Sequence, residues 1–351
     1  MAQAEAVIIS GGFGTRMLPL TERHPKHLLD VGGVPFLEHQ LTKLAGAGIE
    51  HVVLATSYHA EAFVPVLGDG SRYGLRLTYV REEQPLGTGG AIRNAADALG
   101  DDPETAVVIL NGDVLSGHDL ARQLREFEQP RDGRPVDVSL HLVQVEDARA
   151  FGCVPTDDTG RVLEFTEKSE DPVTNQVNAG CYVFRRRVID TIPAGRVVSV
   201  ERETFPGLVD ADATVVGYLE TAYWRDVGSP EALVAASVDV VTGLAPTAAV
   251  RHDDPGASIA ADASVQGKVA GGSVVGSGAV VEPGAEVTGS VLMAGATVRS
   301  GARVVDSVLG PGSIVEAGAV VEGAAIGDDA VVRAGAALTP GTRVCCGVVT
   351  G

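Results

Sequence analysis

The residues best suited to chemistry near the start of the chain are glycines and cations in the segment AVIISGGFGTRMLPLTERHPKHLL. The glycines follow a short apolar run, and their backbone can come close to a ligand because no side chain holds it away. A hydroxyl and two cations follow, which are groups that bind phosphate. The segment supplies Gly11, Gly12, Gly14, Thr15, Arg16 and Lys26.

Two familiar phosphate loops fit this segment poorly. No Gly-Lys-Ser/Thr follows, as a Walker A loop requires, and Met17 stands where a dinucleotide fingerprint needs its third glycine. A third kind of phosphate loop is therefore expected, although a glycine cluster alone is equally compatible with an ordinary strand-to-helix turn.

Carboxylates that suit a metal ion occur at two later points. Asp113 ends the apolar run TAVVILNGD after Asn111, itself a candidate nucleotide contact, and Asp226 precedes a helix start at Ser229 and Pro230. Magnesium usually takes one or two carboxylates and shares the phosphate oxygens of a substrate. A tight Asn-Gly-Asp turn and a purely structural acid near a helix start are the alternatives.

A second glycine-rich loop and an insertion add polar candidates. In REEQPLGTGGAIRNAADAL, backbone amides at the helix start could hold a purine edge or a phosphate, while a simple helix cap is the alternative. The insertion FGCVPTDDTGRVLEFTEKS reads as a β-hairpin and is followed by the strand QVNAGCYVF. Lys168 is one of only four lysines in the chain, and lysine offers a compact, mobile charge that arginine does not.

The elements that would position these residues alternate between strand and helix from Ala6 to Val80. Such alternation predicts a mostly parallel sheet with helices on both faces, an α/β Rossmann-like domain. Ligands of these sheets bind beyond the carboxyl ends of the strands, where the loops at 11–16 and 81–90 should meet.

The bulk composition restricts the partners. A net charge of -19 argues against nucleic acid and anionic membranes, which need a basic face. Four cysteines without a Cys-x-x-Cys pattern suggest a reducing compartment, and neither a signal peptide nor a long apolar segment is evident. A cytoplasmic protein with small-molecule substrates is expected.

The C-terminal part of the chain carries a repeat. Aliphatic residues recur every six positions, as in Val275, Val281 and Val287, and later sets of the same kind begin at Leu292, Leu309 and Ile326. This pattern predicts a three-sided parallel β-helix. Because no histidine occurs after His252, this domain is assigned to assembly or scaffolding, and a homo-oligomer is expected. The predicted division is a catalytic domain at 1–240, a linker at 241–256 and the β-helix at 257–351.

In order along the chain, GGFGTRMLPLT with PKHLL, PLGTGGA, NGD, FTEKS, VNAGCYVF, WRDVGSPEAL and the hexapeptide tail resemble the sugar-nucleotide pyrophosphorylases. PLGTGGA and VERETFPGLV are most similar to the mannose-1-phosphate guanylyltransferases. The resemblance covers essentially the whole chain and implies that the β-helix is left-handed. It also implies a Mg²⁺-assisted, in-line transfer of GMP from GTP to a hexose 1-phosphate, with mannose 1-phosphate as the first candidate, and the release of pyrophosphate.

The resemblance implies roles for individual residues. Arg16 and Lys26 would bind the nucleotide phosphates, and Asp113 and Asp226 would bind magnesium. The other implied contacts are Gln84, Pro85, Gly87 and Thr88 to the base, Glu167 and Lys168 to the sugar phosphate, and Gly152 and Asn178 to the sugar.

Three residues depart from the family's usual pattern: Met17, His27 and Ser169. The acceptor could therefore differ, for example a heptose phosphate or a cyclitol phosphate such as valienol 1-phosphate. A thymidylyl- or uridylyltransferase would share the same charged residues. A regulatory subunit of such an enzyme is a non-catalytic alternative, but it should have lost metal or phosphate residues that are present here.

Overall fold

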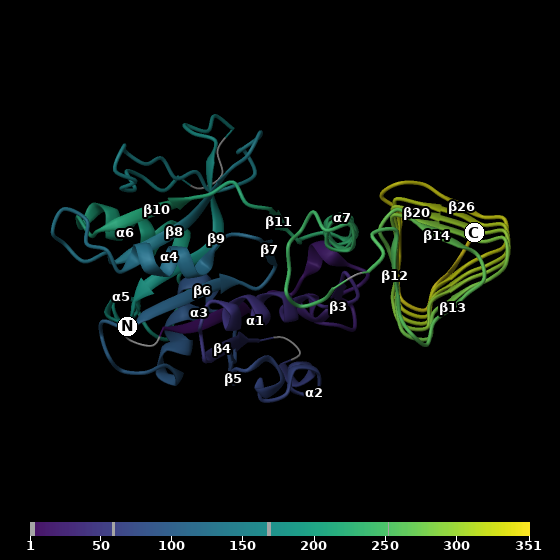
Figure 1. The fold of residues 1–351 in the computed structure, drawn as a ribbon, viewed down its shortest axis with the longest axis horizontal. Helices are drawn as coiled ribbons and strands as arrows, with labels where there is room; N and C mark the ends of the chain where they lie inside the picture. The colour runs from purple at the N-terminus through teal and green to yellow at the C-terminus, as the bar shows by residue number, and fades with distance from the viewer. Residues whose placement is uncertain (1–3, 58–59, 167–169, 252) are drawn as a thin grey trace. The chain divides into compact units, whose positions relative to one another are not determined.

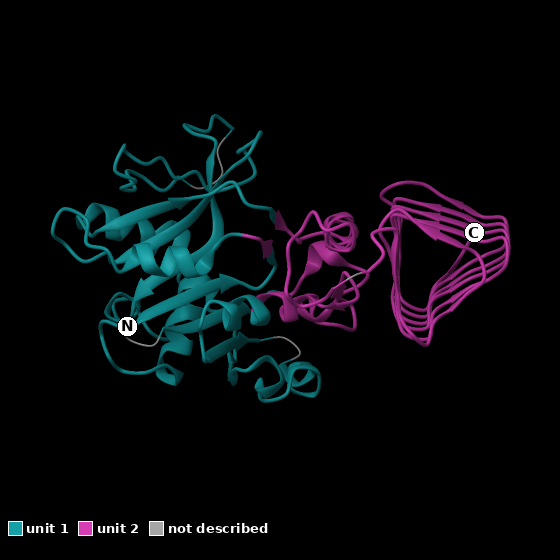
Figure 2. Ribbon diagram, viewed as in Figure 1, with its two compact units in different colours: residues 1–12, 41–114, 118–224 teal, residues 13–40, 115–117, 225–351 magenta. Residues whose placement is uncertain are grey.

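The computed structural model describes residues 4–57, 60–166, 170–251 and 253–351, and these residues form two compact units (Figures 1 and 2). Unit 1 comprises residues 1–12, 41–114 and 118–224, and unit 2 comprises residues 13–40, 115–117 and 225–351. Within the described part of the chain, every helix is too short or too polar to cross a lipid bilayer.

Unit 1 is built on a seven-stranded sheet with the strand order β10-β8-β9-β6-β1-β4-β5. The neighbours β6, β1, β4 and β5 run parallel, whereas β9 is antiparallel to both β6 and β8. The strands are β1 (Glu5–Ser10), β4 (His51–Thr56), β5 (Arg76–Arg81), β6 (Ala106–Asn111), β8 (Val138–Gln144), β9 (Gln176–Arg185) and β10 (Val215–Leu219). The predicted α/β class with a mostly parallel sheet is confirmed.

Both faces of this sheet are buried because its central strands are apolar along their whole length. Val7 and Val53 pack with Ile92 on one face, while Ala6 and Ile8, which point to the other face, are equally buried. The helices are α1 (Phe36–Gly46), α2 (Phe63–Leu67), α3 (Gly87–Ala95), α4 (Leu120–Phe127), α5 (Arg186–Asp190), α6 (Phe205–Asp210) and α7 (Pro230–Val241). The predicted N-cap is present: the Ser229 hydroxyl accepts a hydrogen bond from the Ala232 amide.

In the predicted hairpin at 151–169, the two arms pair with each other within the described residues, although neither arm forms a continuous strand. Cys153 bridges antiparallel to Thr166 and Thr156 to Val162, on either side of a turn around Gly160. The Pro155 carbonyl accepts a hydrogen bond from the Leu163 amide, but proline has no N–H to donate to a ladder. Arg161 bridges instead to Val216 on the sheet edge.

The C-terminal part of unit 2 is the predicted left-handed parallel β-helix, seen along its axis as a triangle in Figure 1. Its interior is a column of aliphatic side chains such as Val275, Leu292, Leu309 and Ile326. Two shorter sheets pair β2 (Asp30–Val31) with β3 (Val34–Pro35) and β7 (Val114–Ser116) with β11 (Trp224–Asp226). The first β-helix face holds β12 (Ala257–Ile259), β15 (Ser273–Val275), β18 (Val291–Leu292), β21 (Val308–Leu309), β24 (Ala325–Ile326) and β27 (Arg343–Val344). The second holds β13 (Ser264–Val265), β16 (Val280–Val281), β19 (Thr297–Val298), β22 (Ile314–Val315), β25 (Val331–Val332) and β28 (Val349–Thr350), and the third holds β14 (Lys268–Ala270), β17 (Glu286–Thr288), β20 (Arg303–Val305), β23 (Val320–Glu322) and β26 (Ala337–Leu338).

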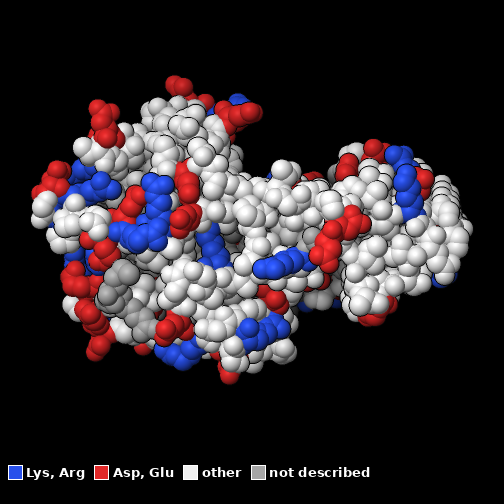
Figure 3. Space-filling view, in the orientation of Figure 1, with Lys and Arg blue, Asp and Glu red and all other residues white. Residues whose placement is uncertain are grey.

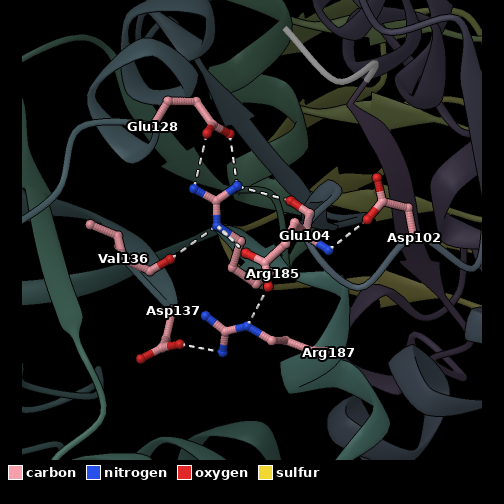
Figure 4. A network of polar contacts seen from close by, with 7 residues as sticks. All are labelled: Asp102, Glu104, Glu128, Val136, Asp137, Arg185 and Arg187. Atoms are coloured by element: carbon pink, nitrogen blue, oxygen red, sulfur yellow. Dashed lines mark hydrogen bonds and ion pairs between the residues drawn. The ribbon is translucent and has the colours of Figure 1, made fainter. Parts of the chain in front are cut away.

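Charged side chains of both signs are interspersed over the face of unit 1 drawn in Figure 3, and the sides of the β-helix visible there are mostly uncharged. One ionic network of unit 1 has a buried arginine at its centre, Arg185, whose acidic partners reach the surface (Figure 4). Arg185 at the end of β9 donates two hydrogen bonds of 3.0 Å to Glu128, one of 3.2 Å to the Val136 carbonyl and one of 2.9 Å to the Glu104 carbonyl. Its guanidinium also stacks on Phe127, 4.3 Å from the ring centroid. The network therefore joins β9 to the end of α4 and the segment before β6.

Two buried histidines in unit 1 make folding sensitive to acid. The rings of His118 and His141 stack with centroids 3.9 Å apart, and Lys43 donates to Nδ1 of His118 at 2.9 Å. Burial, and then the charge of Lys43, lower the pKa of His141 from 6.5 to about 3, and burial also lowers the pKa of His118. Both histidines are therefore neutral in the folded protein at neutral pH.

We expect the His141→Phe variant to lose less stability in acid than the wild type. Below pH 6.5 the unfolded chain binds a proton at this position that the folded protein refuses until about pH 3, so stability falls as the pH falls through that window. One such histidine contributes a slope of about 1.4 kcal/mol per pH unit. Urea unfolding at pH 6, 5 and 4 measures how steeply the free energy of unfolding falls as the pH is lowered. An equally steep fall in the two proteins would contradict the prediction.

Candidate active site

In unit 1, the glycine loop begins directly after β1, next to the carboxyl ends of the parallel strands β4 and β5. A side chain on Gly11 would place its Cβ 3.1 Å from the Ser57 hydroxyl and 3.4 Å from Oε2 of Glu82. The Ser57 hydroxyl also donates a hydrogen bond to the Gly11 carbonyl. Glycine is thus required here by the close approach of two polar side chains from neighbouring strand ends.

Glu82 is a functional candidate that sequence reasoning missed. It directly follows β5, the residue is 7% exposed, and its Oε1 atom has no hydrogen-bond partner among the described residues. Burial raises the pKa of this carboxyl, against the opposing effect of a hydrogen bond from the Leu86 backbone. A buried carboxylate oxygen without a donor is costly, and such groups occur preferentially where a ligand supplies the donor. The only local signal was a pair of adjacent acids, Glu82 and Glu83, of which the second is exposed.

The second glycine loop has a packing role that its sequence does not reveal. The amides of Gly89 and Gly90 both donate to the carbonyl of Val198, so they are not open to a phosphate or a base. A Cβ on Gly87 would lie 2.6 Å from the same carbonyl oxygen, and Gly87 also has a φ of +71°. The Thr88 hydroxyl donates to Glu201. Among the predicted base contacts, this leaves the side chains of Gln84 and Pro85 exposed in the loop.

The predicted sugar-pocket residues lie together in unit 1. The Asn178 amide donates 2.8 Å to the Tyr182 hydroxyl, which is also hydrogen-bonded to Asn111. The backbone N–H of Asn178 donates to the Gly152 carbonyl at 2.9 Å. Asn111, which was predicted to contact the nucleotide, therefore lies beside the predicted sugar-pocket residues Gly152 and Asn178, around one buried tyrosine.

In unit 2, the remainder of the first loop brings two predicted residues together. Gly14 has a φ of +63°, and the short turn Thr15–Met17 follows it. The guanidinium of Arg16 lies 3.9 Å from the carboxylate of Asp226, and the Arg16 side chain is 69% exposed. Gly228 makes room for it, since a Cβ there would lie 2.6 Å from an Arg16 nitrogen.

Lys26 belongs to the same part of unit 2. A Cβ on Gly14 would meet the Lys26 Cβ at 3.3 Å, and the Thr21 hydroxyl donates to the Gly14 carbonyl at 2.8 Å. Thr21 and Lys26 therefore pack against the turn that carries Arg16. Arg16 and Lys26, the two cations predicted to bind the nucleotide phosphates, therefore both lie next to Gly14, whose backbone is in the left-handed region.

Asp113, Glu167 and Lys168 complete the set of predicted site residues. Asp113 lies in the turn between β6 and β7, at the carboxyl end of a buried strand as predicted. Glu167 and Lys168 lie outside the described residues. Among residues 4–57, 60–166, 170–251 and 253–351, no cluster of three or more His, Cys, Asp or Glu side chains could hold a metal.

Comparison with known proteins matches this architecture. Residues 5–243 match the nucleotidyl transferase family, and residues 255–340 match a GlmU-like C-terminal hexapeptide family. A mannose-1-phosphate guanylyltransferase of Mycobacterium tuberculosis is 52% identical over 294 residues, which cover 81% of this chain and 78% of that protein. A mannose-1-phosphate guanyltransferase of Yarrowia lipolytica is 33% identical over 256 residues, covering 72% of this chain and 69% of that one.

A solved structure extends the comparison. HddC from Yersinia pseudotuberculosis aligns with a TM-score of 0.58 and 26% identity over 68% of this chain and 100% of its own. The same protein has also been solved in complex with GMP-PN, with a TM-score of 0.57. The predicted resemblance and the predicted enzyme class are confirmed, and the chain is a member of the nucleotidyl transferase family.

Proposed function

We propose that the protein transfers GMP from GTP to a sugar 1-phosphate, with mannose 1-phosphate as the first candidate, and releases pyrophosphate. The names of the relatives that share most of its length support this choice. The buried Glu82 beside the glycine loop is the structural observation that carries the choice of guanine.

Base selection follows from the chemistry of a carboxylate. The N1–H and the N2 amino group of guanine form two adjacent donors, whereas adenine offers one donor beside an acceptor, and uracil or thymine offers one donor between two acceptors. An ionised Glu82 can only accept hydrogen bonds, so it is complementary to guanine and repels the acceptors of the other bases. Binding two donors would also satisfy the Oε1 atom that has no partner within the described chain.

The remaining residues would hold the phosphates. A phosphate oxygen of the sugar 1-phosphate attacks the α-phosphorus of the nucleotide, the bond from that phosphorus to the bridging oxygen breaks, and pyrophosphate leaves with the electron pair. Arg16 and Lys26 would offset the repulsion between two polyanions and stabilise charge on the leaving group. Lys168 and Glu167 are proposed to hold the sugar phosphate, and Gly152 and Asn178 the sugar.

The residues also suit the predicted Mg²⁺. Asp113 and Asp226 offer hard carboxylate oxygens, and magnesium commonly takes one or two such ligands with phosphate oxygens completing its shell. Bound there, the ion would neutralise phosphate charge during displacement. That Asp113 and Asp226 bind the same ion stays a prediction.

The variant Glu82→Gln is expected to lose its preference for GTP. Glutamine presents one acceptor and one donor, which matches uracil and thymine better than guanine. We expect kcat/KM for GTP to fall by about 10- to 100-fold, since a good bidentate contact is worth about 1–3 kcal/mol of discrimination. We expect kcat/KM for dTTP or UTP to rise. Initial rates of pyrophosphate release with each nucleotide measure this change.

The neighbouring Glu83→Gln provides a matched control because it makes the same substitution at an exposed position. It should leave the ranking of nucleotides unchanged. If Glu82→Gln keeps the wild-type preference for GTP, Glu82 does not read the base.

The acceptor is tested by a grid of nucleoside triphosphates against hexose, heptose and cyclitol 1-phosphates. The fastest pyrophosphate release is expected with GTP and mannose 1-phosphate, and faster turnover of another pair would replace this assignment.

Met17 and His27, two departures from the family pattern, are buried, and Ser169 lies outside the described residues. The two buried side chains give no reason to prefer a different acceptor.

The domain division at 1–240, 241–256 and 257–351 and assembly into a homo-oligomer also stay proposals. Light scattering on the full chain tests the second, and the pattern of limited proteolysis tests the first.

A further inference from the structure

One face of the β-helix differs from the other two in its outward-facing side chains. On the face formed by β15, β18, β21 and β24, every residue of these short strands is buried. The last residue of each strand points into the core of the β-helix. The residue before it points outward, and these residues form a row of Val274, Val291, Val308 and Ala325. Helix α7 packs against β15 and β21 and covers part of this row from outside, within unit 2.

The row ends in an arginine. Val308 pairs with Ala325, and Ala325 pairs in turn with Arg343 and not with Thr342, because the last coil is longer than the coil before it. At this end of the face, Nη1 of Arg343 donates hydrogen bonds to the carbonyl of Arg16 at 2.8 Å and to that of Leu18 at 2.9 Å. A guanidinium thus replaces the apolar contact where the β-helix meets the loop that carries Arg16.

Adjacent residues of the last coils also contact this loop. His24 pairs with the buried Asp328 at 2.7 Å, and Arg23 pairs with Asp329 at 2.7 Å. The thiol of Cys346 lies 3.7 Å from the Pro19 carbonyl. These contacts bring the terminal coils against residues 16–24 at several points, with Arg343 nearest to Arg16.

The Arg16 turn needs such support because it is short. Two backbone hydrogen bonds close it, Met17 to Gly14 at 2.8 Å and Leu18 to Thr15 at 3.3 Å. The last carbonyls of any helical turn have no partner inside the turn. Arg343 donates to two carbonyls here, one on each side of Met17, and therefore restrains the backbone from which the exposed Arg16 side chain projects.

We propose that Arg343 is a positioning residue for the reaction: the last coil of the β-helix holds the Arg16 backbone so that the guanidinium of Arg16 meets the nucleotide phosphates. The proposal rests on the proposed function in assigning phosphates to Arg16. Misplacing a charged group by about 1 Å can cost on the order of 100-fold in rate. The β-helix then contributes to catalysis without touching the substrate.

The test compares Arg343→Met with Arg343→Lys and with the control Arg303→Met, whose arginine is exposed on another face of the β-helix. Arg343→Met should lower kcat by about 10- to 100-fold and speed amide hydrogen exchange in residues 14–20, while the melting temperature changes little. Arg343→Lys, which keeps a positive donor, should recover part of the rate and of the protection, and Arg303→Met should match the wild type.

An unchanged kcat in Arg343→Met overturns the proposal, even if exchange in residues 14–20 increases, because the contact would then be structural only. A loss of kcat without faster exchange in this segment overturns it as well. The rates are taken with the best substrate pair from the grid, so a different base or acceptor refutes the proposed function and leaves this test intact. If Arg343→Met does not fold, the comparison of Arg343→Lys with the wild type gives the same two readouts.

Discussion

Replacing Arg16 with methionine is expected to lower kcat at least about a thousandfold while changing the free energy of unfolding by less than about 0.5 kcal/mol. The side chain is 69% exposed, and its 3.9 Å approach to Asp226 is an ion pair of a kind that adds little stability. A guanidinium that contacts the transferring phosphoryl group, in contrast, is worth about 10³- to 10⁵-fold in kcat. A large loss of kcat with little change in the free energy of unfolding identifies a residue that acts in the reaction and not in folding.

The measurement combines initial rates of pyrophosphate release with urea unfolding of the same preparations. Arg16→Lys is the matched variant: it keeps the charge but loses the planar fork that binds two phosphate oxygens, so an intermediate rate is expected. Turnover of Arg16→Met within tenfold of the wild type would remove Arg16 from the site.

The second large effect concerns stability. Arg185→Ala is expected to lower the free energy of unfolding by about 2–4 kcal/mol, because it removes a buried guanidinium and leaves the backbone carbonyls that accept from it without that donor. The Arg185 side chain is 7% exposed, and its loss would leave the Val136 carbonyl without this donor and remove the stacking on Phe127. The transition in urea should move to lower concentration with an unchanged slope.

Arg122→Ala is the control because it removes an arginine–glutamate contact of 2.9 Å on the exposed side of α4. Its unfolding midpoint should equal that of the wild type. If both variants unfold at the same urea concentration, the contacts of the buried Arg185 contribute no more than a surface pair.

Patterns between near neighbours in the sequence predicted much of the fold. The alternation of apolar runs with helical segments was enough for the mixed sheet, because each strand needs only a local run of buried residues. The hexad repeat specified the β-helix because each inward residue, such as Val298 or Val315, recurs at a fixed spacing.

The candidate site divides in the same way. Residue type and spacing pointed to Arg16, Lys26, Asn111 and Asn178 because glycine loops and strand ends are visible locally. The glycines of the second loop were interpreted as ligand-facing, but the amides of Gly89 and Gly90 are used by Val198, which lies far along the chain from them. No local pattern shows which distant carbonyl will consume a backbone donor.

The sequence by itself determined the order of the elements, the phosphate-binding character of the first loop, the β-helix and the family. Only the tertiary structure decided that Glu82 is buried beside Gly11 and that Arg343 donates to the carbonyl of a residue 327 positions earlier. Periodicity is a property of adjacent residues and can be recognised without folding the chain. The partner of a charge or a hydrogen-bonding group depends instead on how the chain returns on itself, and that return is set by the packing of the whole core.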